Sequence, residues 1–141
     1  MSAKPIVLVA AAALIDADGR VLVAQRPEGK VMAGLWEFPG GKLSAGETPE
    51  AALARELMEE LALTVCETCL YPVSFASHAY EDFHLLMPLF QCRNWEGTPN
   101  PQEGQEIRWL FPNRLHSLAM PPADAPLVAA LIDLLGQETK N

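Results

Sequence analysis

The chain has 141 residues, with 10 Lys and Arg against 18 Asp and Glu, and a formal net charge of -8. This length suits one domain with one modest core, which we expect to span residues 1–141. Half of the residues are hydrophobic and a fifth are charged, which is a globular composition and excludes a disordered chain. The acidic charge excludes broad binding of a nucleic acid polymer, because phosphate backbones need a basic surface. A small phosphate-bearing ligand would need metal ions in such a site.

Three cysteines, Cys66, Cys69 and Cys92, cannot all pair with one another. We favour reduced thiols in a cytoplasmic protein. The first two stand at Cys-x-x-Cys spacing, but zinc would need two more ligands, and neither His78 nor His84 belongs to a paired-ligand pattern. Metal or redox chemistry at these thiols is therefore the less favoured interpretation.

The first elements in the chain are predicted to be strands. Ile6–Leu14 is apolar but only nine residues long, too short to cross a bilayer, and lacks the features of a signal peptide. We interpret it as a buried strand that turns through Asp16–Gly19 into a hairpin partner, Val21–Gln25. We accordingly expect a cytoplasmic protein with no membrane partner.

The remaining elements follow from turn residues and hydrophobic patterns. Arg26–Leu35 is expected to be a loop, Trp36–Phe38 extended, and Pro39–Gly41 a break. Leu70–Ser77, Phe83–Cys92 and Ile107–Phe111 are predicted strands, Asn94–Gly104 a loop, and Ala125–Leu135 a final helix that Asp124 could cap. Strands and helices in this order indicate an α+β or mixed α/β fold in which two helices cover a sheet.

The segment Pro49–Leu61 is the strongest predicted helix. It contains no Gly and no internal Pro, and it is rich in Ala, Leu and Glu. Thr48 can cap it, Pro49 fits the first helical position, and Glu50 complements the positive end of the helix dipole.

Three carboxylates share one face of this helix. Glu56, Glu59 and Glu60 are spaced i, i+3 and i+4, so they fall within an arc of about 100°. Their mutual repulsion favours a compensating hard cation such as Mg²⁺. A solvated acidic face is the alternative, and for a glutamate cluster alone it is the favoured one. Gly40 and Gly41, which let backbone approach a ligand closely, shift the balance toward metal binding.

Residues 41–63 resemble the signature box of Nudix hydrolases. That box reads Gly, five residues, Glu, seven residues, Arg-Glu, an aliphatic residue, any residue, Glu-Glu, any residue, Gly and an aliphatic residue. The matching positions are Gly41, Glu47, Arg55, Glu56, Leu57, Glu59, Glu60 and Leu63. Ala62 stands where the family has Gly, which affects a left-handed helix end by about 1 kcal/mol and removes no ligand.

The resemblance extends from about Val7 to the final helix, through QRPEGKVMAGLWEFPGGK, WEGTPNPQEGQ and MPPADAP, which are similar to stretches of MutT-type Nudix hydrolases. It implies a Nudix-type α/β/α sandwich with a mixed β-sheet between helices. It also implies hydrolysis of oxidised guanine nucleoside triphosphates.

The resemblance implies a set of catalytic and metal-binding residues. Mg²⁺, with Mn²⁺ as an alternative, would be bound by the backbone carbonyl of Gly40 and by Glu56, Glu59, Glu60 and Glu103. Either Glu56 or Glu103 would act as the base, and their roles stay open. Arg55 would orient the carboxylates and form an ion pair with Glu47.

The resemblance also implies which residues bind the substrate: Arg26, Glu37, Phe38, Pro39, Gly40, Lys42, Asp82 and Asp124. Arg26 and Lys42 would bind phosphates, since cations suit this ligand, although both could lie in solvent. Phe38 could stack near the base or pack in the core, and the core is the default. Asp82 lies near the base site by resemblance and is otherwise a solvated residue.

Asp124 stands where MutT-type enzymes have an Asn that reads the purine edge. An ionised carboxylate accepts hydrogen bonds only, which suits the N1–H and amino donors of guanine. A helix cap is the alternative role.

These observations predict a Mg²⁺-dependent enzyme that hydrolyses a small nucleotide, 8-oxo-dGTP in the first place, to nucleoside monophosphate and diphosphate. The alternatives are another Nudix substrate, such as a pyrimidine nucleotide or ADP-ribose, and a non-catalytic lesion-recognition module. A monomer is favoured.

Overall fold

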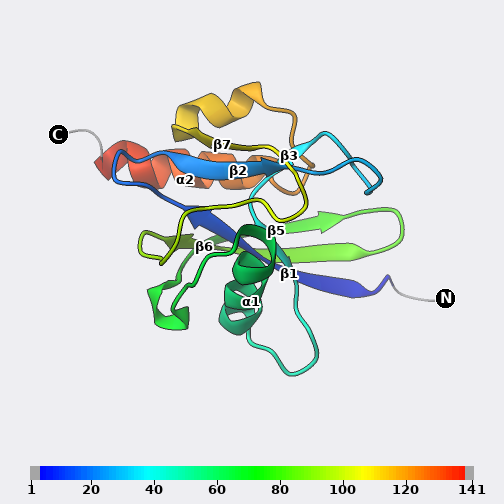
Figure 1. The fold of residues 1–141 in the computed structure, drawn as a ribbon. Helices are drawn as coiled ribbons and strands as arrows, with labels where there is room; N and C mark the ends of the chain where they lie inside the picture. The colour runs from blue at the N-terminus through cyan, green and yellow to red at the C-terminus, as the bar shows by residue number, and fades with distance from the viewer. Residues whose placement is uncertain (1–3, 139–141) are drawn as a thin grey trace.

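The computed structural model describes residues 4–138. Along the chain, strands β1 to β4 precede helix α1, and strands β5 to β7 precede helix α2, as Figure 1 shows. The strands are β1 (Ile6–Leu14), β2 (Val21–Gln25), β3 (Trp36–Glu37), β4 (Gly40–Lys42), β5 (Tyr71–Ala79), β6 (His84–Cys92) and β7 (Ile107–Leu110). The helices are α1 (Pro49–Leu61) and α2 (Ala125–Glu138), with the 3-10 turns η1 (Glu67–Cys69) and η2 (Pro112–Ser117).

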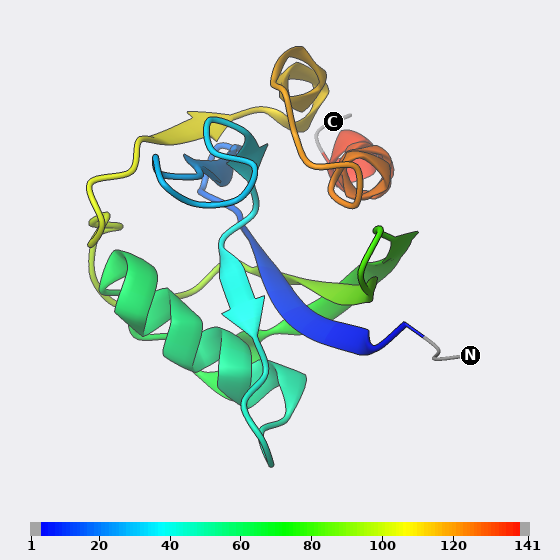
Figure 2. The same ribbon diagram turned by 90° about the vertical axis from the view of Figure 1, so that its right-hand side faces the viewer.

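The strands form two sheets. The larger one has the order β4-β1-β6-β5 and is mixed, because β1 runs parallel to β6 and antiparallel to β4. The smaller one has the order β3-β2-β7 and is antiparallel. Figure 2 shows the larger sheet between α1 on one side and α2 on the other. The expected α/β/α sandwich with a mixed sheet is confirmed.

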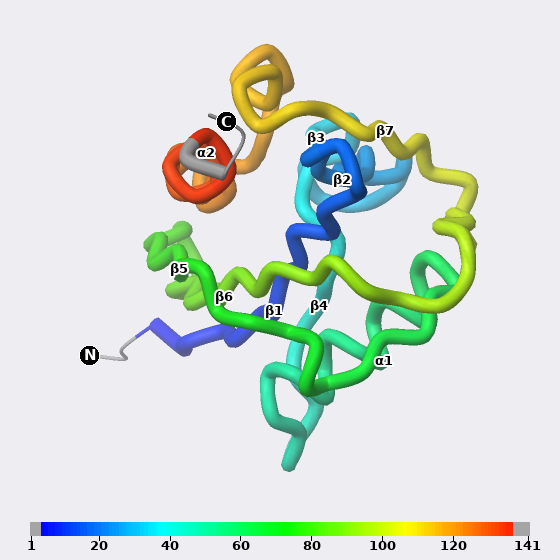
Figure 3. Tube along the Cα trace, turned by 90° about the vertical axis from the view of Figure 1, so that its left-hand side faces the viewer, coloured from blue at the N-terminus to red at the C-terminus, as the bar shows by residue number. Residues whose placement is uncertain are grey.

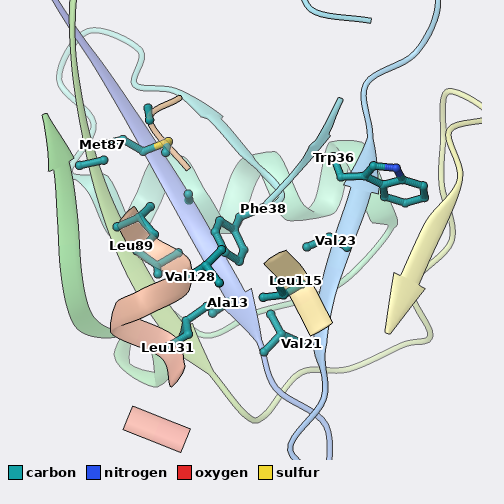
Figure 4. Close-up of a cluster of buried hydrophobic side chains, with 14 of the residues drawn as sticks. Ala13, Val21, Val23, Trp36, Phe38, Met87, Leu89, Leu115, Val128 and Leu131 are labelled. Carbon is teal, nitrogen blue, oxygen red and sulfur yellow. The ribbon is translucent and has the colours of Figure 1, made fainter. Parts of the chain in front are cut away.

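Strand β1 is buried on both faces over its second half. Ala10, Ala12 and Leu14 pack with the apolar side of α1, whereas Ala11, Ala13 and Ile15 pack with the cluster that includes α2. Alternate side chains of a strand point to opposite faces, so a continuous apolar run fits a strand between two layers. Figure 4 shows the α2-side cluster, with Phe38 among Met87, Leu89, Leu115 and Val128.

Two predictions about the first strands are wrong. β1 and β2 meet only at the bridge Ile15↔Val21 and then enter different sheets, so no extended hairpin forms. The predicted break at Pro39–Gly41 is partly strand β4, which pairs with β1. A Cβ on Gly40 would lie 2.0 Å from the carbonyl oxygen of Ala10, so glycine here permits a close strand pairing that resembles a turn in sequence.

Helix α1 has the predicted bounds and N-terminal cap. The Thr48 hydroxyl accepts a hydrogen bond from the Ala51 N–H at 3.1 Å. At the other end, Ala62 has φ 57° and ψ 35°, and the N–H groups of Ala62 and Leu63 bond to the carbonyls of Met58 and Leu57. This is a Schellman-type end. Alanine thus adopts the left-handed conformation in which the family has glycine.

The two 3-10 turns η1 and η2 were not predicted, because three to six residues carry too little periodicity to detect. η1 contains Cys69 and follows Cys66 directly. η2 leads toward α2, which runs beside it in Figure 3. Within residues 4–138, no helix is long and apolar enough to span a membrane.

Candidate active site

Strand β4 brings a glycine pair against the acidic face of α1. A Cβ on Gly41 would lie 2.3 Å from the carboxyl carbon of Glu56. A larger residue here would push the Glu56 carboxylate out of this position. The fold therefore places the Gly41 backbone directly against a carboxylate of α1.

Arg55 lies at the centre of the charged network on α1. Its Nε and Nη2 donate to the two carboxylate oxygens of Glu47 at 2.8 and 2.9 Å, which confirms the predicted ion pair. Its Nη1 donates to Glu56 at 2.9 Å and lies 3.3 Å from Glu59, and its Nη2 donates to the Lys42 carbonyl at 3.1 Å. The Arg55 guanidinium and the Ser44 N–H lower the pKa of Glu47 to about 2. Arg55 therefore ties together the loop before α1, strand β4 and two of the carboxylates.

Glu60 is the carboxylate most affected by its surroundings. Its pKa is raised to about 8, mainly by burial and in addition by the negative charges of Glu56 and Glu37, while the Gly40 N–H opposes the shift. A buried carboxylate beside like charges favours a proton or a cation. This excess of negative charge is what a divalent cation would relieve.

The donor set fits a hard metal ion, although the side chains do not yet surround one point. Between residues 4 and 138, no three His, Cys, Asp or Glu side chains form a group that could hold a metal. Glu56 and Glu59 instead face Arg55. Carboxylate and carbonyl oxygens are nevertheless the ligands that Mg²⁺ prefers.

Glu103 belongs to the same pocket as Glu60 but approaches from another loop. That loop is anchored to the end of α1, because the N–H groups of Asn100 and Gln102 donate to the carbonyls of Leu61 and Glu60 at 2.9 Å each. The Glu103 carboxylate lies 3.1 Å from Nζ of Lys30. Lys30 was not singled out in the sequence, since a loop lysine carries no pattern.

Arg26 and Glu37 form an ion pair across strands β2 and β3. The Arg26 Nη1 donates to both Glu37 oxygens at 3.1 Å, and its Nε donates to the Val31 carbonyl at 2.7 Å. Burial raises the pKa of Glu37, and the positive charge of Arg26 opposes it. Arg26 thus reaches the pocket as expected, but part of its hydrogen-bonding capacity is used by the protein.

Asp124 is the buried charged residue of this region, with a 5% exposed fraction. Its Oδ2 accepts a hydrogen bond from the Phe38 N–H at 3.3 Å. Burial raises the pKa of Asp124 to about 7, with the Phe38 N–H lowering it and the Glu37 charge raising it. Near neutral pH the carboxyl is therefore part protonated, and it can donate as well as accept a hydrogen bond.

Two adjoining pockets share Arg26, Glu37, Lys42 and Asp124 in their walls. The polar pocket also includes Glu60, Glu103, Pro39 and Gly40, whereas the apolar one includes Tyr80, Phe83 and Met32. The Phe38 side chain is 4% exposed and packs in the core, as the default interpretation had it. Asp82 is exposed in the turn between β5 and β6 and lines neither pocket.

The apolar pocket was missed in the sequence. Tyr80 and Phe83 stack with ring centroids 5.0 Å apart, and burial raises the pKa of Tyr80. The sequence around these two aromatic residues gives no sign of a pocket. The β5–β6 hairpin places them in one pocket wall with Asp124.

A family model described as the NUDIX domain matches residues 10–130. This chain belongs to the Nudix family. It is accordingly an enzyme, a Nudix hydrolase, and members of the family generally need a divalent metal ion. The resemblance of the sequence to this family is confirmed.

The similar proteins of known activity act on small nucleotides. This Nudix hydrolase is 37% identical to an 8-oxo-dGTP diphosphatase of Haemophilus influenzae, over 98% of this chain and 97% of the relative. It is 39% identical to a CTP pyrophosphohydrolase of Escherichia coli, over 87% and 90%.

Solved structures agree on the fold. The solution structure of the E. coli ORF135 protein superposes with a TM-score of 0.82 at 31% identity, covering 98% of this chain and 96% of that one. A MutT structure from work on the Aliivibrio salmonicida and Vibrio cholerae proteins has a TM-score of 0.77 at 30% identity, covering 92% and 98%.

Proposed function

We propose that this Nudix hydrolase cleaves purine nucleoside triphosphates, 8-oxo-dGTP in the first place, to nucleoside monophosphate and diphosphate. Its role would be to remove oxidised nucleotides before DNA synthesis. The observation that carries the proposal is the composition of the polar pocket. Its wall contains Glu60 and Glu103 together with the buried carboxyl of Asp124. This neighbourhood supports a metal-dependent hydrolytic centre that would stand beside a polar group for reading the base.

Mg²⁺, or Mn²⁺ in its place, would be held by Glu56, Glu59, Glu60, Glu103 and the Gly40 carbonyl. Held by these groups, the ion would neutralise phosphoryl oxygens and orient water. The protein would supply the rest. Arg55 keeps Glu56 and Glu59 near β4, Lys42 lies in the pocket wall where phosphates would enter, and either Glu56 or Glu103 would accept the proton of the attacking water.

Asp124 would read the base from the border of the polar and apolar pockets. Its carboxyl can accept from the N1–H and amino groups that guanine and 8-oxoguanine share. The remaining base surface would lie against the apolar wall, where Tyr80 and Phe83 supply aromatic faces. Pro39 would fix the backbone between Phe38 and Gly40, and Asp82 would act from the edge of the hairpin.

Pyrimidine triphosphates are the second candidate substrates. They are favoured by the 39% identity to a CTP pyrophosphohydrolase of Escherichia coli. A nucleotide panel separates the candidates: 8-oxo-dGTP, dGTP, dATP and CTP, with diphosphate release measured with and without Mg²⁺. We expect the highest kcat/KM for 8-oxo-dGTP and no turnover without metal. A higher value for CTP would move the proposal to the second candidate.

Two properties of the protein as a whole are part of the same proposal. We propose that it acts as a monomer in the cytoplasm, without a nucleic acid polymer or a membrane as partner. A sedimentation experiment on the full chain would give the oligomeric state.

A further inference from the structure

The three thiols lie together beyond the end of α1, away from the residues that line the two pockets of the active site. Cys66 is exposed, Cys69 is half-buried and Cys92 is buried. Because of this difference in exposure, solutes can reach the Cys66 thiol most easily. The Cys69 thiol is mainly accessible to Cys66, and the buried Cys92 thiol is not accessible to solutes.

The turn around η1 brings two of these thiols into contact. The Cys69 N–H donates to the Cys66 carbonyl at 2.9 Å, which closes a tight turn. The two side chains lie within hydrogen-bond reach of each other. Cysteines separated by two residues in such a turn are close enough for a disulfide without a large backbone movement.

The surroundings of the two sulfur atoms differ in the way a reactive pair requires. The Sγ of Cys66 lies 2.9 Å from the Thr68 hydroxyl, which can donate to a thiolate. This hydroxyl, the N–H of Thr68 and the Cys69 thiol lower the pKa of Cys66. Burial raises the pKa of Cys69. An exposed cysteine with a lowered thiol pKa beside a half-buried cysteine with a raised thiol pKa is the arrangement of an attacking and a resolving cysteine.

We propose that Cys66 and Cys69 form a peroxide-reactive dithiol that closes to a reversible disulfide, independently of nucleotide hydrolysis. The Cys66 thiolate attacks one oxygen of hydrogen peroxide: an S–O bond forms, the O–O bond breaks, and hydroxide leaves and takes up the thiol proton as water. The Cys69 sulfur then attacks the Cys66 sulfur, so that the S–S bond forms, the S–O bond breaks and a second water leaves with the Cys69 proton. The two sulfur atoms lose two electrons and the peroxide gains them.

The sequence allows the bond to be located directly. Glu67 lies between the two cysteines, so cleavage after glutamate separates residues 61–67 from residues 68–81 and leaves Cys92 in another peptide. After brief treatment of the full chain with hydrogen peroxide, we expect peptides 61–67 and 68–81 to be joined, and to separate with dithiothreitol.

Matched variants complete the test. Cys92→Ser should form the same linked peptides at an unchanged rate, whereas Cys69→Ser should stop at a Cys66 sulfenic acid that dimedone labels. Cys66→Ser should form neither product. The proposal is overturned if peroxide yields only over-oxidised cysteine or dimers between chains, if the linked peptide contains Cys92, or if Cys66 reacts no faster than a cysteine in an unfolded peptide.

Discussion

Glu59 and Glu60 differ in environment although they are neighbours on one helix face. Glu59 has a 59% exposed side chain beside Arg55, whereas Glu60 is half-buried with a pKa near 8. If both bind metal, Glu59→Gln and Glu60→Gln each keep the side-chain shape but remove ligand charge. We expect turnover to fall by orders of magnitude in both variants.

Stability measured on the same variants gives the control. Removing a repelled carboxylate should leave the free energy of unfolding unchanged or raise it slightly, more for Glu60 than for Glu59. Glu50→Gln, at a half-buried position in the first turn of α1, serves as a matched variant with normal turnover. Near-normal rates at saturating Mg²⁺ in both site variants would disprove the ligand assignment.

Asp124 is the residue on which base preference depends. Losing a charge-assisted hydrogen bond costs about 1.5–3 kcal/mol, so Asp124→Ala should lower kcat/KM by roughly 10- to 100-fold on 8-oxo-dGTP and on dGTP alike. The value for dCTP should change little. An equal loss on every nucleotide would mean that Asp124 supports the structure and does not read the base; thermal midpoints of both proteins show which applies.

At the scale of the element, helix α1 ends at a non-glycine residue in the left-handed backbone conformation. Ala62 has φ 57°, where alanine costs about 1 kcal/mol more than glycine. Ala62→Gly should therefore raise the free energy of unfolding by up to about 1 kcal/mol, and the melting temperature by a few degrees. Ala54→Gly, in the middle of α1, should lower stability by a similar amount. A destabilised Ala62→Gly would contradict the strain argument.

At the scale of the whole molecule, Asp124 links α2 to the end of β3, and its burial makes stability depend on pH. The carboxyl has a pKa of 3.8 unperturbed and about 7 in the folded chain. Between these values the folded state keeps a proton that the unfolded chain has lost. The free energy of unfolding should therefore fall as pH rises from 4 to 7, by at most about 1.4 kcal/mol per pH unit.

Asp124→Asn tests this dependence, because the amide oxygen can still accept from the Phe38 N–H but cannot ionise. The free energy of unfolding of the variant, measured with urea, should exceed that of the parent by more at pH 8 than at pH 5. Asp133→Asn, an exposed aspartate on α2, is the control and should follow the parent at both values. Parallel curves for all three proteins would contradict a buried ionisable Asp124.

The thiol cluster and the hydrolytic site should be separable. The proposed metal site uses oxygen ligands, whereas thiolates favour softer ions. The variant with Cys66, Cys69 and Cys92 all replaced by Ser should keep its kcat/KM, with some loss of stability from the buried Cys92. Stoichiometric zinc in the purified protein, lost with the first two cysteines, would show that these thiols bind metal instead.

Local chemistry was enough to predict several elements from the amino-acid sequence. Helix α1 begins and ends where Thr48, Pro49 and the loss of periodicity place it, whereas the Glu47–Arg55 ion pair was implied by the resemblance to the signature box. Strands β1 and β2 have the predicted bounds, and β6 begins one residue after the predicted Phe83, because apolar runs favour buried strands.

Tertiary structure decided the rest, because contacts between distant residues leave no local pattern. The assignment of β1 and β2 to different sheets depends on the pairing of β1 with β4 and β6, and the short β4 exists only because Gly40 can approach Ala10. The pKa of Asp124 depends on burial beneath Phe38, 86 residues away in the chain. The sequence by itself thus determined helix α1 and its row of carboxylates. The packing of the two sheets decided that Glu103 and Asp124 line the same pocket as Glu60.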